Sequence, residues 1–259
     1  MLIEAHTHLD HYEEPLLATA LAEIAEHQII TLSNAVNPPS YRRLLEIAQE
    51  SRWVIPSFGI HPWWAAEYID QLNACMRLIE QSPLLGEIGL DYRWVQAETF
   101  PAQREVFEFF LAAARAQDKI VNLHTKDAEA DVLRYLDDYD IQRAIVHWYS
   151  GPLDILEQMI ERGFYFTVGV ELAHSEHIRA VAQTIPLNRL LTETDNPGGL
   201  KWLTGETGYP HHLLGVLDVL AEMKAISVDE LTQVIAENFI RLIQADPHLA
   251  TLHEFLSVA

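Results

Sequence analysis

Short apolar runs alternate with longer amphipathic segments along the whole 259-residue chain. The runs have the length of buried strands, and the segments between them carry apolar residues at helical spacing. Repeated β-then-α units of this kind produce parallel strands joined by right-handed crossovers. The strand-like runs lie at 1–9, 28–36, 53–61, 84–92, 119–126, 143–150, 164–170 and 189–196, and the helix-like segments between them at 14–27, 39–51, 66–81, 101–117, 127–138, 152–162 and 174–184.

Eight such units in about 250 residues predict a single (β/α)8 TIM barrel. A doubly wound open sheet is the alternative arrangement of the same units. Two further helices are expected at 210–224 and 228–244, and the second opens with the capping sequence SVDE. No stretch rich in proline, glycine or serine divides the chain, so we expect residues 1–259 to form one domain.

The composition is strongly acidic, with 38 acidic side chains against 17 basic ones and a formal charge of -21. Such a chain repels polyanions at long range, which counts against broad nucleic-acid binding unless bound cations create a local positive site. The single cysteine, Cys75, cannot form an internal disulfide, and the chain starts without a basic-then-apolar signal, so a cytoplasmic protein is expected. No apolar run approaches the roughly 18 residues of a membrane helix, so no membrane association is expected.

Side chains that bind metals gather at the carboxyl ends of the predicted strands, where barrels of this kind carry their chemistry. His6 and His8 end the first run and, being two residues apart, point to the same side of a strand. Taken singly, such residues are typical of a buried histidine or an ion pair, but six of them at one end of successive strands predict a metal site. The other four are Glu87, His124, His147 and Asp195.

Six nitrogen and oxygen ligands exceed the four of one tetrahedral zinc ion. They suit two divalent ions that share a carboxylate, as in two-metal phosphoesterases and hydrolases. Imidazole-rich ligands favour zinc, manganese or iron over magnesium or calcium, but ligand type leaves zinc, manganese and magnesium all open. Glu87 is the expected bridge. The other ligands divide between the ions, with His6, His8 and Asp195 on one and His124 and His147 on the other.

The order of the motifs resembles that of the TatD family, which consists of metal-dependent hydrolases of the amidohydrolase superfamily. The resemblance extends over almost the whole chain, from His6 to Asn238 and Phe239. It implies a TIM barrel with metal-dependent DNase activity, often exonucleolytic, and it assigns the metal to the same six residues. The segments that carry it are AHTHLD, GIHPWW, GEIGLDYRW, QREVFEFFLAAA, VNLHTKDA, VHWYSG and LLTETDNP.

The resemblance also places His61 of the GIHP motif beside the metals, in contact with substrate phosphate. Two cations would lower the pKa of a shared water and neutralise charge on the phosphoryl oxygens. Asp195 would orient that water and accept its proton, Glu87 would hold both ions, and His61 would donate a hydrogen bond to the phosphate. The alternative for His61 is an ordinary loop side chain beside Pro62.

Three segments depart from the family pattern. Lys126, in HTKDA, stands where arginine is common, so a bidentate phosphate contact becomes a point charge. The motif HWYSG replaces an HCFSG-like motif and places Trp148 and Tyr149 beside His147. The segment GGLKWLTGETGYP, which contains Trp202, replaces a basic, asparagine-containing loop. These changes leave the metal ligands intact and leave the substrate preference open.

Five of the six tryptophans follow predicted strand ends: Trp63, Trp64, Trp94, Trp148 and Trp202. They either pack the loops together or form an aromatic rim that stacks bases. Basic residues in the same loops are few, namely Arg93, Lys126 and Lys201. We therefore expect a single-stranded or frayed DNA end, or a small phosphoester, rather than a long duplex. The expected substrate contacts are His61, Lys126, Trp63, Trp148 and Trp202.

The leading hypothesis is a two-metal phosphodiesterase, a deoxyribonuclease that removes nucleotides from DNA ends with a metal-activated water. One alternative is an amidohydrolase, lactonase or phosphotriesterase that uses the same metals on a small molecule. Many such relatives bridge their metals with a carboxylated lysine on a strand, whereas here Lys119 lies at a strand start and Glu87 takes the bridging position. The second alternative is a weakly catalytic barrel that serves as an interaction partner.

Overall fold

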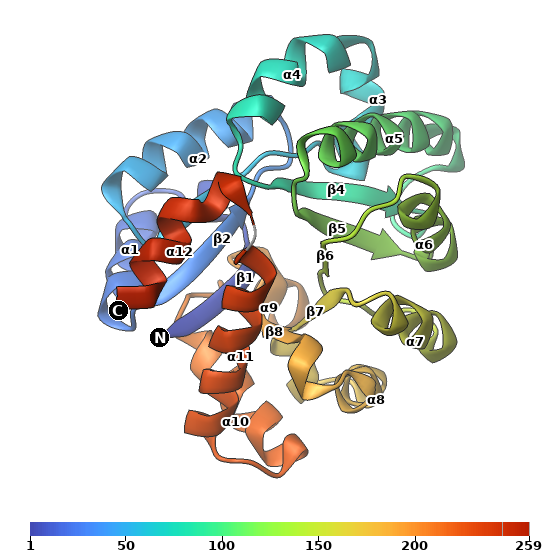
Figure 1. The fold of residues 1–259 in the computed structure, drawn as a ribbon. Helices are drawn as coiled ribbons and strands as arrows, with labels where there is room; N and C mark the ends of the chain where they lie inside the picture. The colour runs from blue at the N-terminus through green and yellow to red at the C-terminus, as the bar shows by residue number, and fades with distance from the viewer. Residues whose placement is uncertain (245, 259) are drawn as a thin grey trace.

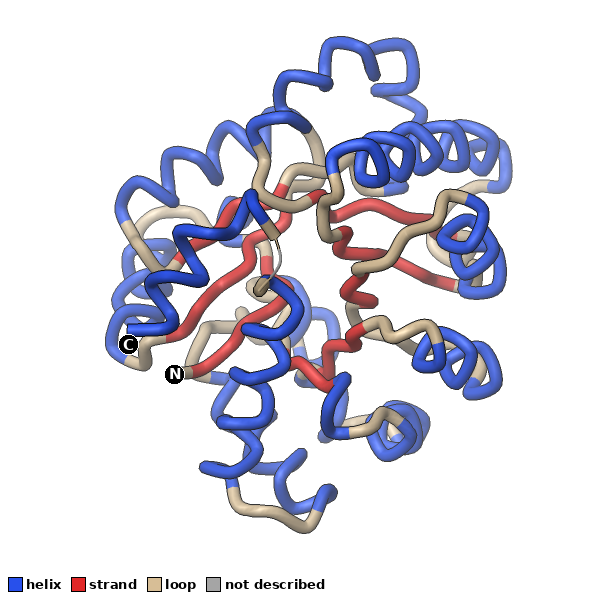
Figure 2. The backbone as a smooth tube through the Cα atoms, viewed as in Figure 1, coloured by secondary structure: helices blue, strands red, loops and turns tan. Residues whose placement is uncertain are grey.

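The computed structural model describes residues 1–244 and 246–258, which form a barrel of parallel strands inside a ring of helices (Figure 1). Figure 2 shows the strands in red at the centre and the helices in blue around them. This arrangement confirms the predicted TIM barrel. The strands are β1 (Leu2–Thr7), β2 (Ile29–Asn34), β3 (Val54–Ser57), β4 (Leu85–Asp91), β5 (Val121–Lys126), β6 (Ala144–Val146), β7 (Tyr165–Val168) and β8 (Leu190–Thr192).

The strands form two parallel ladders, one from β1 to β3 and one from β4 to β8. The barrel closes at two seams, where β3 meets β4 and where β8 meets β1. At the first seam, the backbone N–H of Gly86 donates to the carbonyl of Phe58 at 3.0 Å. At the second, the N–H of Asp195 donates to the carbonyl of His6 at 3.2 Å. Closure removes the open edges that a doubly wound sheet would keep, and it places the end of β8 beside the end of β1.

Most of the predicted helices are present, with ends displaced by a few residues. Helix α11 contacts both β1 and β8, and Asn238 Nδ2 donates to the carbonyl of Leu190 at 2.9 Å, so this helix supports the second seam. Ser227 caps its start by accepting from the N–H of Glu230, as the capping sequence predicted. These helices are α1 (Leu16–Glu26), α2 (Pro38–Glu50), α5 (Phe100–Gln117), α6 (Glu129–Asp138), α7 (Leu153–Glu161), α8 (Glu176–Thr184), α10 (His212–Lys224) and α11 (Val228–Ile243).

The predicted helix 66–81 is interrupted in the structure. It consists of α3 (Ala65–Tyr68), a 3₁₀ turn (Ile69–Gln71) and α4 (Leu72–Gln81). The buried residues Ala65, Leu72, Cys75 and Ile79 keep helical spacing across the break, so periodicity alone could not reveal it.

Two helices were not predicted. Helix α9 (Gly198–Thr204) begins with two glycines, which are poor helix formers, so its sequence is typical of a loop. Helix α12 (Ala250–Val258) follows the last predicted segment. Among the residues that the structure describes, none of the helices is both long enough and apolar enough to span a membrane.

Gly89 allows β4 to approach β5 at the point where His124 lies. It pairs with His124 in the ladder, and its φ of 146° belongs to a region that L residues rarely adopt. A Cβ atom at this position would lie 2.0 Å from the carbonyl oxygen of His124. The close approach therefore requires glycine.

We expect Gly89→Ala to lower the free energy of unfolding by about 3 kcal/mol or more, because it adds both a backbone clash and a strained φ. Gly215→Ala is the matched control, since Gly215 lies in α10 with no atom within 4 Å of the added methyl group. The control should gain about 0.5–1 kcal/mol from helix propensity. Urea denaturation followed by circular dichroism measures both. Equal stability of Gly89→Ala and the parent protein would contradict this account of the β4–β5 contact.

Candidate metal centre

The barrel brings all six predicted metal ligands together at the carboxyl ends of its strands. His6 lies in β1 and His8 follows it, whereas Glu87 lies in β4, roughly opposite in the strand order. His124 lies in β5, and His147 and Asp195 follow β6 and β8. The glutamate and the four histidines are buried in the protein interior.

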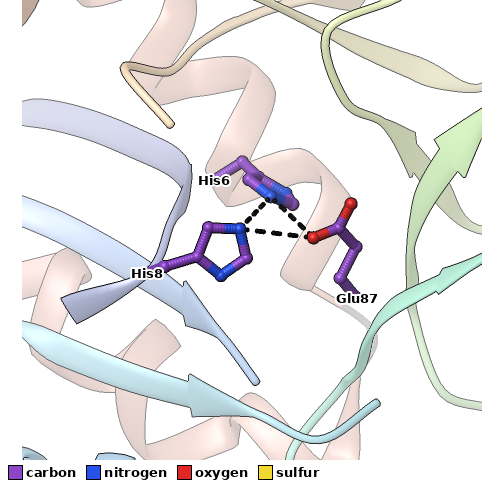
Figure 3. A group of neighbouring side chains, drawn as sticks. All are labelled: His6, His8 and Glu87. Atoms are coloured by element: carbon purple, nitrogen blue, oxygen red, sulfur yellow. Dashed lines mark hydrogen bonds and ion pairs between the residues drawn. The ribbon is translucent and has the colours of Figure 1, made fainter. Parts of the chain in front are cut away.

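One carboxylate oxygen of Glu87 faces the first group of donors (Figure 3). His6 Nε2 lies 3.4 Å from Glu87 Oε2, and His8 Nε2 lies 3.3 Å from the same oxygen. The two imidazole nitrogens are 3.4 Å apart. Asp195 Oδ1 completes the group, 3.7 Å from His6 Nε2 and 3.2 Å from His8 Nε2.

These spacings match the geometry of a four-coordinate metal ion. Tetrahedral ligands at about 2.0–2.2 Å from an ion are separated from one another by about 3.3–3.6 Å. Five of the six separations between these four donor atoms lie between 3.2 and 3.7 Å, and His6, His8 and Glu87 form a complete set of mutually close donors. The first group therefore has the number, chemistry and spacing of atoms that suit one divalent cation.

The other oxygen of Glu87 faces a second group of donors. Glu87 Oε1 lies 2.8 Å from His124 Nδ1 and 3.0 Å from His147 Nε2. These two nitrogens are 3.5 Å apart. His61 Nε2 adjoins the group, 3.4 Å from Glu87 Oε1 and 3.3 Å from His124 Nδ1. Glu87 thus stands between two sets of imidazole nitrogens, one on each oxygen.

Outer hydrogen bonds leave the inner nitrogens of His6 and His8 available as acceptors. His6 Nδ1 lies 2.8 Å from the side-chain oxygen of Asn122, and His8 Nδ1 lies 2.7 Å from the carbonyl oxygen of Asn34. An oxygen acceptor requires the ring proton on Nδ1, so Nε2 of each neutral ring presents a lone pair to the centre.

The second group follows the same rule with carboxylates as outer partners. His124 Nε2 lies 2.9 Å from Asp91 Oδ2, which assigns its ring proton to Nε2 and leaves Nδ1 facing Glu87. His147 Nδ1 lies 3.4 Å from Glu193 Oε2 and leaves Nε2 facing Glu87. Carboxylate–histidine pairs of this kind fix the orientation of metal-binding imidazoles and increase their basicity.

His61 has the opposite polarity. Its Nδ1 accepts a hydrogen bond from the backbone N–H of Trp63 at 3.2 Å, so the proton of the neutral ring lies on Nε2. Burial lowers the pKa of His61 to about 4, against the opposing effect of Glu87, which keeps the ring neutral. His61 is therefore built to donate a hydrogen bond into the site. This geometry disfavours the alternative of an ordinary loop side chain.

The electrostatics of the centre favour positive charge. Burial by itself would lower the pKa of His8, but hydrogen bonds to Asp195 and Glu87 outweigh it and raise that pKa well above the usual value. Burial would likewise lower the pKa of His147, whose contacts with Glu87 and Glu193 raise it to about 9. Burial would raise the pKa of Glu87, yet the surrounding histidines hold it well below its usual value. Such a pocket stabilises a cation, whether a proton or a metal ion.

The sequence did not identify all of these supporting residues. Asn34 and Asn122 lie inside strands, and Glu193 lies two residues before Asp195 without any motif that points to its role. Asp91 lies in the segment GEIGLDYRW, but no role was predicted for it. Opposing effects of burial and of the hydrogen bond from His124 leave its pKa at about 2, so it stays ionised.

A cavity of about 870 Å³ opens above the two donor groups. The predicted substrate contacts all line it, and Glu87 and Asp195 form part of the same wall. Lys126 donates to the carbonyl of Trp148 at 2.6 Å and to Ser150 Oγ at 3.0 Å, so much of its hydrogen-bonding capacity is already used. The predicted contacts are His61, Lys126, Trp63, Trp148 and Trp202.

A closed barrel with buried histidine and carboxylate donors at its strand ends is the arrangement of a metal-dependent hydrolase. The model of the family described as TatD related DNase matches residues 3–244. The chain therefore belongs to the TatD-related DNase family.

Named relatives extend over nearly the whole chain. The uncharacterized metal-dependent hydrolase YcfH of Escherichia coli K12 is 30% identical over 260 residues, 95% of this chain and 96% of that protein. The crystal structure of YjjV, a TatD homolog from Escherichia coli K12, is similar with a TM-score of 0.84 and 25% identity, covering 93% of this chain and 97% of that chain. The human deoxyribonuclease TATDN3 is 22% identical over 96% of both chains.

We expect Asp91→Asn to weaken metal binding at the second donor group by about 10–100-fold, because His124 loses its charged partner. Competition with a fluorescent chelator measures the affinity of each site. Asp127→Asn is the matched control, since Asp127 is exposed and pairs with Arg93 instead. Unchanged affinity in Asp91→Asn would show that the Asp91–His124 hydrogen bond does not support metal binding.

Proposed function

We propose that this chain is a two-metal phosphodiesterase that hydrolyses DNA from its ends, with residues 1–259 acting as one TatD-like domain. The observation that carries the proposal is the position of Glu87, whose two oxygens each face a separate group of donors. Membership of the TatD-related DNase family and similarity to a human deoxyribonuclease support the choice of DNA.

In this proposal the two donor groups would each hold a divalent cation, and Glu87 would offer one oxygen to each. His6, His8 and Asp195 would hold the first ion, and His124 and His147 would hold the second. When bound, the ions supply an activated water and Lewis acidity at the phosphoryl oxygens. Zinc, manganese and magnesium are the candidates, and the imidazole-rich donor set favours the first two over magnesium.

The protein's own residues have separate tasks in the reaction. Asp195 orients the attacking water and accepts its proton, because its carboxylate lies at the edge of the first donor group and also lines the cavity. His61 donates a hydrogen bond from its Nε2–H to a phosphate oxygen, which stabilises part of the charge that develops there. Lys126 contributes a positive charge on the cavity wall.

The cavity suits the end of a strand better than the middle of a duplex. Its basic lining residues are Arg93 and Lys126, and Arg93 is already paired with Asp127 at 3.4 Å. Duplex binding depends on many phosphate contacts from lysine and arginine. A single-stranded or frayed end brings one scissile phosphate to the metals and does not require many contacts from lysine and arginine.

A small neutral ester is the second candidate substrate. Glu171 lines the same cavity, and its carboxylate accepts a hydrogen bond from the indole N–H of Trp148. A negative charge on the wall favours a neutral phosphotriester or lactone over a polyanion.

The test is to strip the protein with a chelator and restore it separately with zinc, manganese and magnesium. We expect restored protein to release nucleotides from end-labelled single-stranded DNA and the stripped protein to release none. Asp195→Asn should lower the rate by about 100-fold or more, because a positioned base contributes that much. Asp218→Asn, on the exposed face of α10, is the matched control and should leave the rate unchanged.

A parallel panel of neutral phosphotriesters and lactones distinguishes the two candidate substrates. Metal-dependent turnover of these compounds alone would overturn the DNA assignment and retain the two-metal site. Cleavage of DNA that survives both metal removal and Asp195→Asn would overturn the whole mechanism.

A further inference from the structure

Three tryptophans form an aromatic row along the cavity above the donor groups, Trp94 and Trp148 from loops and Trp202 from α9. Trp202 occupies the middle, with its ring centroid 6.2 Å from that of Trp94 and 6.0 Å from that of Trp148. Both neighbours lie nearly perpendicular to it, at 78° and 81°. All three rings line the cavity that Glu87 and Asp195 also line, so the row is continuous with the proposed catalytic centre.

Two of the three rings in the row are exposed, and Trp148 is partly buried against the core. Trp202 is 62% exposed and Trp94 is 52% exposed, whereas Trp53, which belongs to the core, is only 8% exposed. Exposing adjacent indole rings to water is unfavourable, and such clusters mark binding surfaces. Edge-to-face contacts hold the Trp202 ring between its neighbours and still leave most of its surface open.

Two tryptophans of the cavity, Trp63 and Trp148, are held by hydrogen bonds from their indole N–H groups. The indole N–H of Trp63 donates to Asp91 Oδ2 at 2.7 Å, which ties this ring to the partner of His124. The indole N–H of Trp148 donates to Glu171, and its backbone has a φ of 39°, which is rare for a bulky residue. These hydrogen bonds hold Trp63, which is 53% exposed, and Trp148 in place, so both help to shape the site, whereas Trp202 and Trp94 are the exposed rings of the row.

The charges around the row indicate what kind of ligand it takes. The guanidinium of Arg93 lies 5.1 Å from the centre of the Trp94 ring and pairs with Asp127. The ammonium of Lys126 lies 5.6 Å from the Trp148 ring and donates to Trp148 and Ser150. Both cations are engaged, so the row offers flat π surfaces rather than a grip on phosphates. Nucleobases stack on such surfaces.

We propose that Trp202, flanked by Trp94, stacks the bases beside the scissile phosphate at the end of a single strand. This inference rests on the proposed function and assigns its substrate recognition to ring stacking. Because every base has a π face, the row accepts all four bases with little sequence preference. Trp63 and Trp148, which were expected from the sequence to contact substrate together with Trp202, act in this view through Asp91 and Glu171.

The test compares a short labelled strand with a strand of equal length that lacks bases. Binding is measured by fluorescence anisotropy with metal-loaded Asp195→Asn protein, in which turnover is slow, and within a time too short for cleavage. We expect the strand with bases to bind at least about tenfold more tightly than the abasic strand, as stacking on one ring predicts. Adding Trp202→Ala should remove about tenfold of the affinity for the strand with bases and leave abasic binding unchanged.

Two controls separate stacking from a structural role. Trp202→Phe keeps a ring and should retain most of the preference for bases. Leu214→Ala removes another exposed apolar side chain, on α10 and outside the cavity lining, and should change nothing. Equal binding of both strands by the parent protein, or an equal loss for both strands in Trp202→Ala, would overturn the stacking proposal.

Cleavage of the same strands by the active, metal-loaded protein is also measured, and it decides whether the protein is a nuclease. Base-dependent binding that Trp202→Ala abolishes, without any cleavage, would support stacking and overturn the nuclease assignment. Equal binding and equal cleavage of the strand with bases and of the abasic strand would support the nuclease assignment and overturn the stacking proposal.

Discussion

The carboxylate of Glu87 is the charge around which the rest of the site is arranged. A buried carboxylate is costly unless positive or hydrogen-bonding groups surround it. Here imidazole nitrogens of His6 and His8 face one oxygen, and those of three further histidines, His61, His124 and His147, face the other. Those residues come from strands on both sides of the barrel, so only the closed sheet can assemble them.

The barrel also fixes what each imidazole presents to the centre. Asn122, Asn34 and Asp91 hold the outer nitrogens of His6, His8 and His124, and each inner nitrogen is left as an acceptor. His61 has the opposite arrangement. Its Nδ1 accepts from the backbone N–H of Trp63, so its Nε2 is a hydrogen-bond donor at the edge of the site. Ring orientation thus connects strand register to chemistry, because a slip of one residue would turn these side chains away from one another.

The barrel and the six donors could be predicted from the sequence because both depend on local order. His6 and His8 end an apolar run at strand spacing, His124, His147 and Asp195 lie near the ends of later runs, and Glu87 lies within the run 84–92. The supporting roles of Asn34 and Asn122 could not be predicted, because the backbone carbonyl of Asn34 and the side chain of Asn122 reach the histidines of the first strand only once the strands are assembled. Helix α9 could not be predicted because its sequence begins with two glycines. The position of Trp202 in the aromatic row could not be predicted either, because it depends on tertiary contacts.

The central claim is that Glu87 joins two metal ions into one centre, and electron paramagnetic resonance of manganese-loaded protein tests it most directly. Two Mn²⁺ ions that share a carboxylate lie about 3.5–4 Å apart and couple their spins. The account predicts a coupled spectrum at two ions per chain, which Glu87→Ala converts to that of isolated ions. A spectrum of magnetically isolated Mn²⁺ at full loading of the parent protein would contradict it.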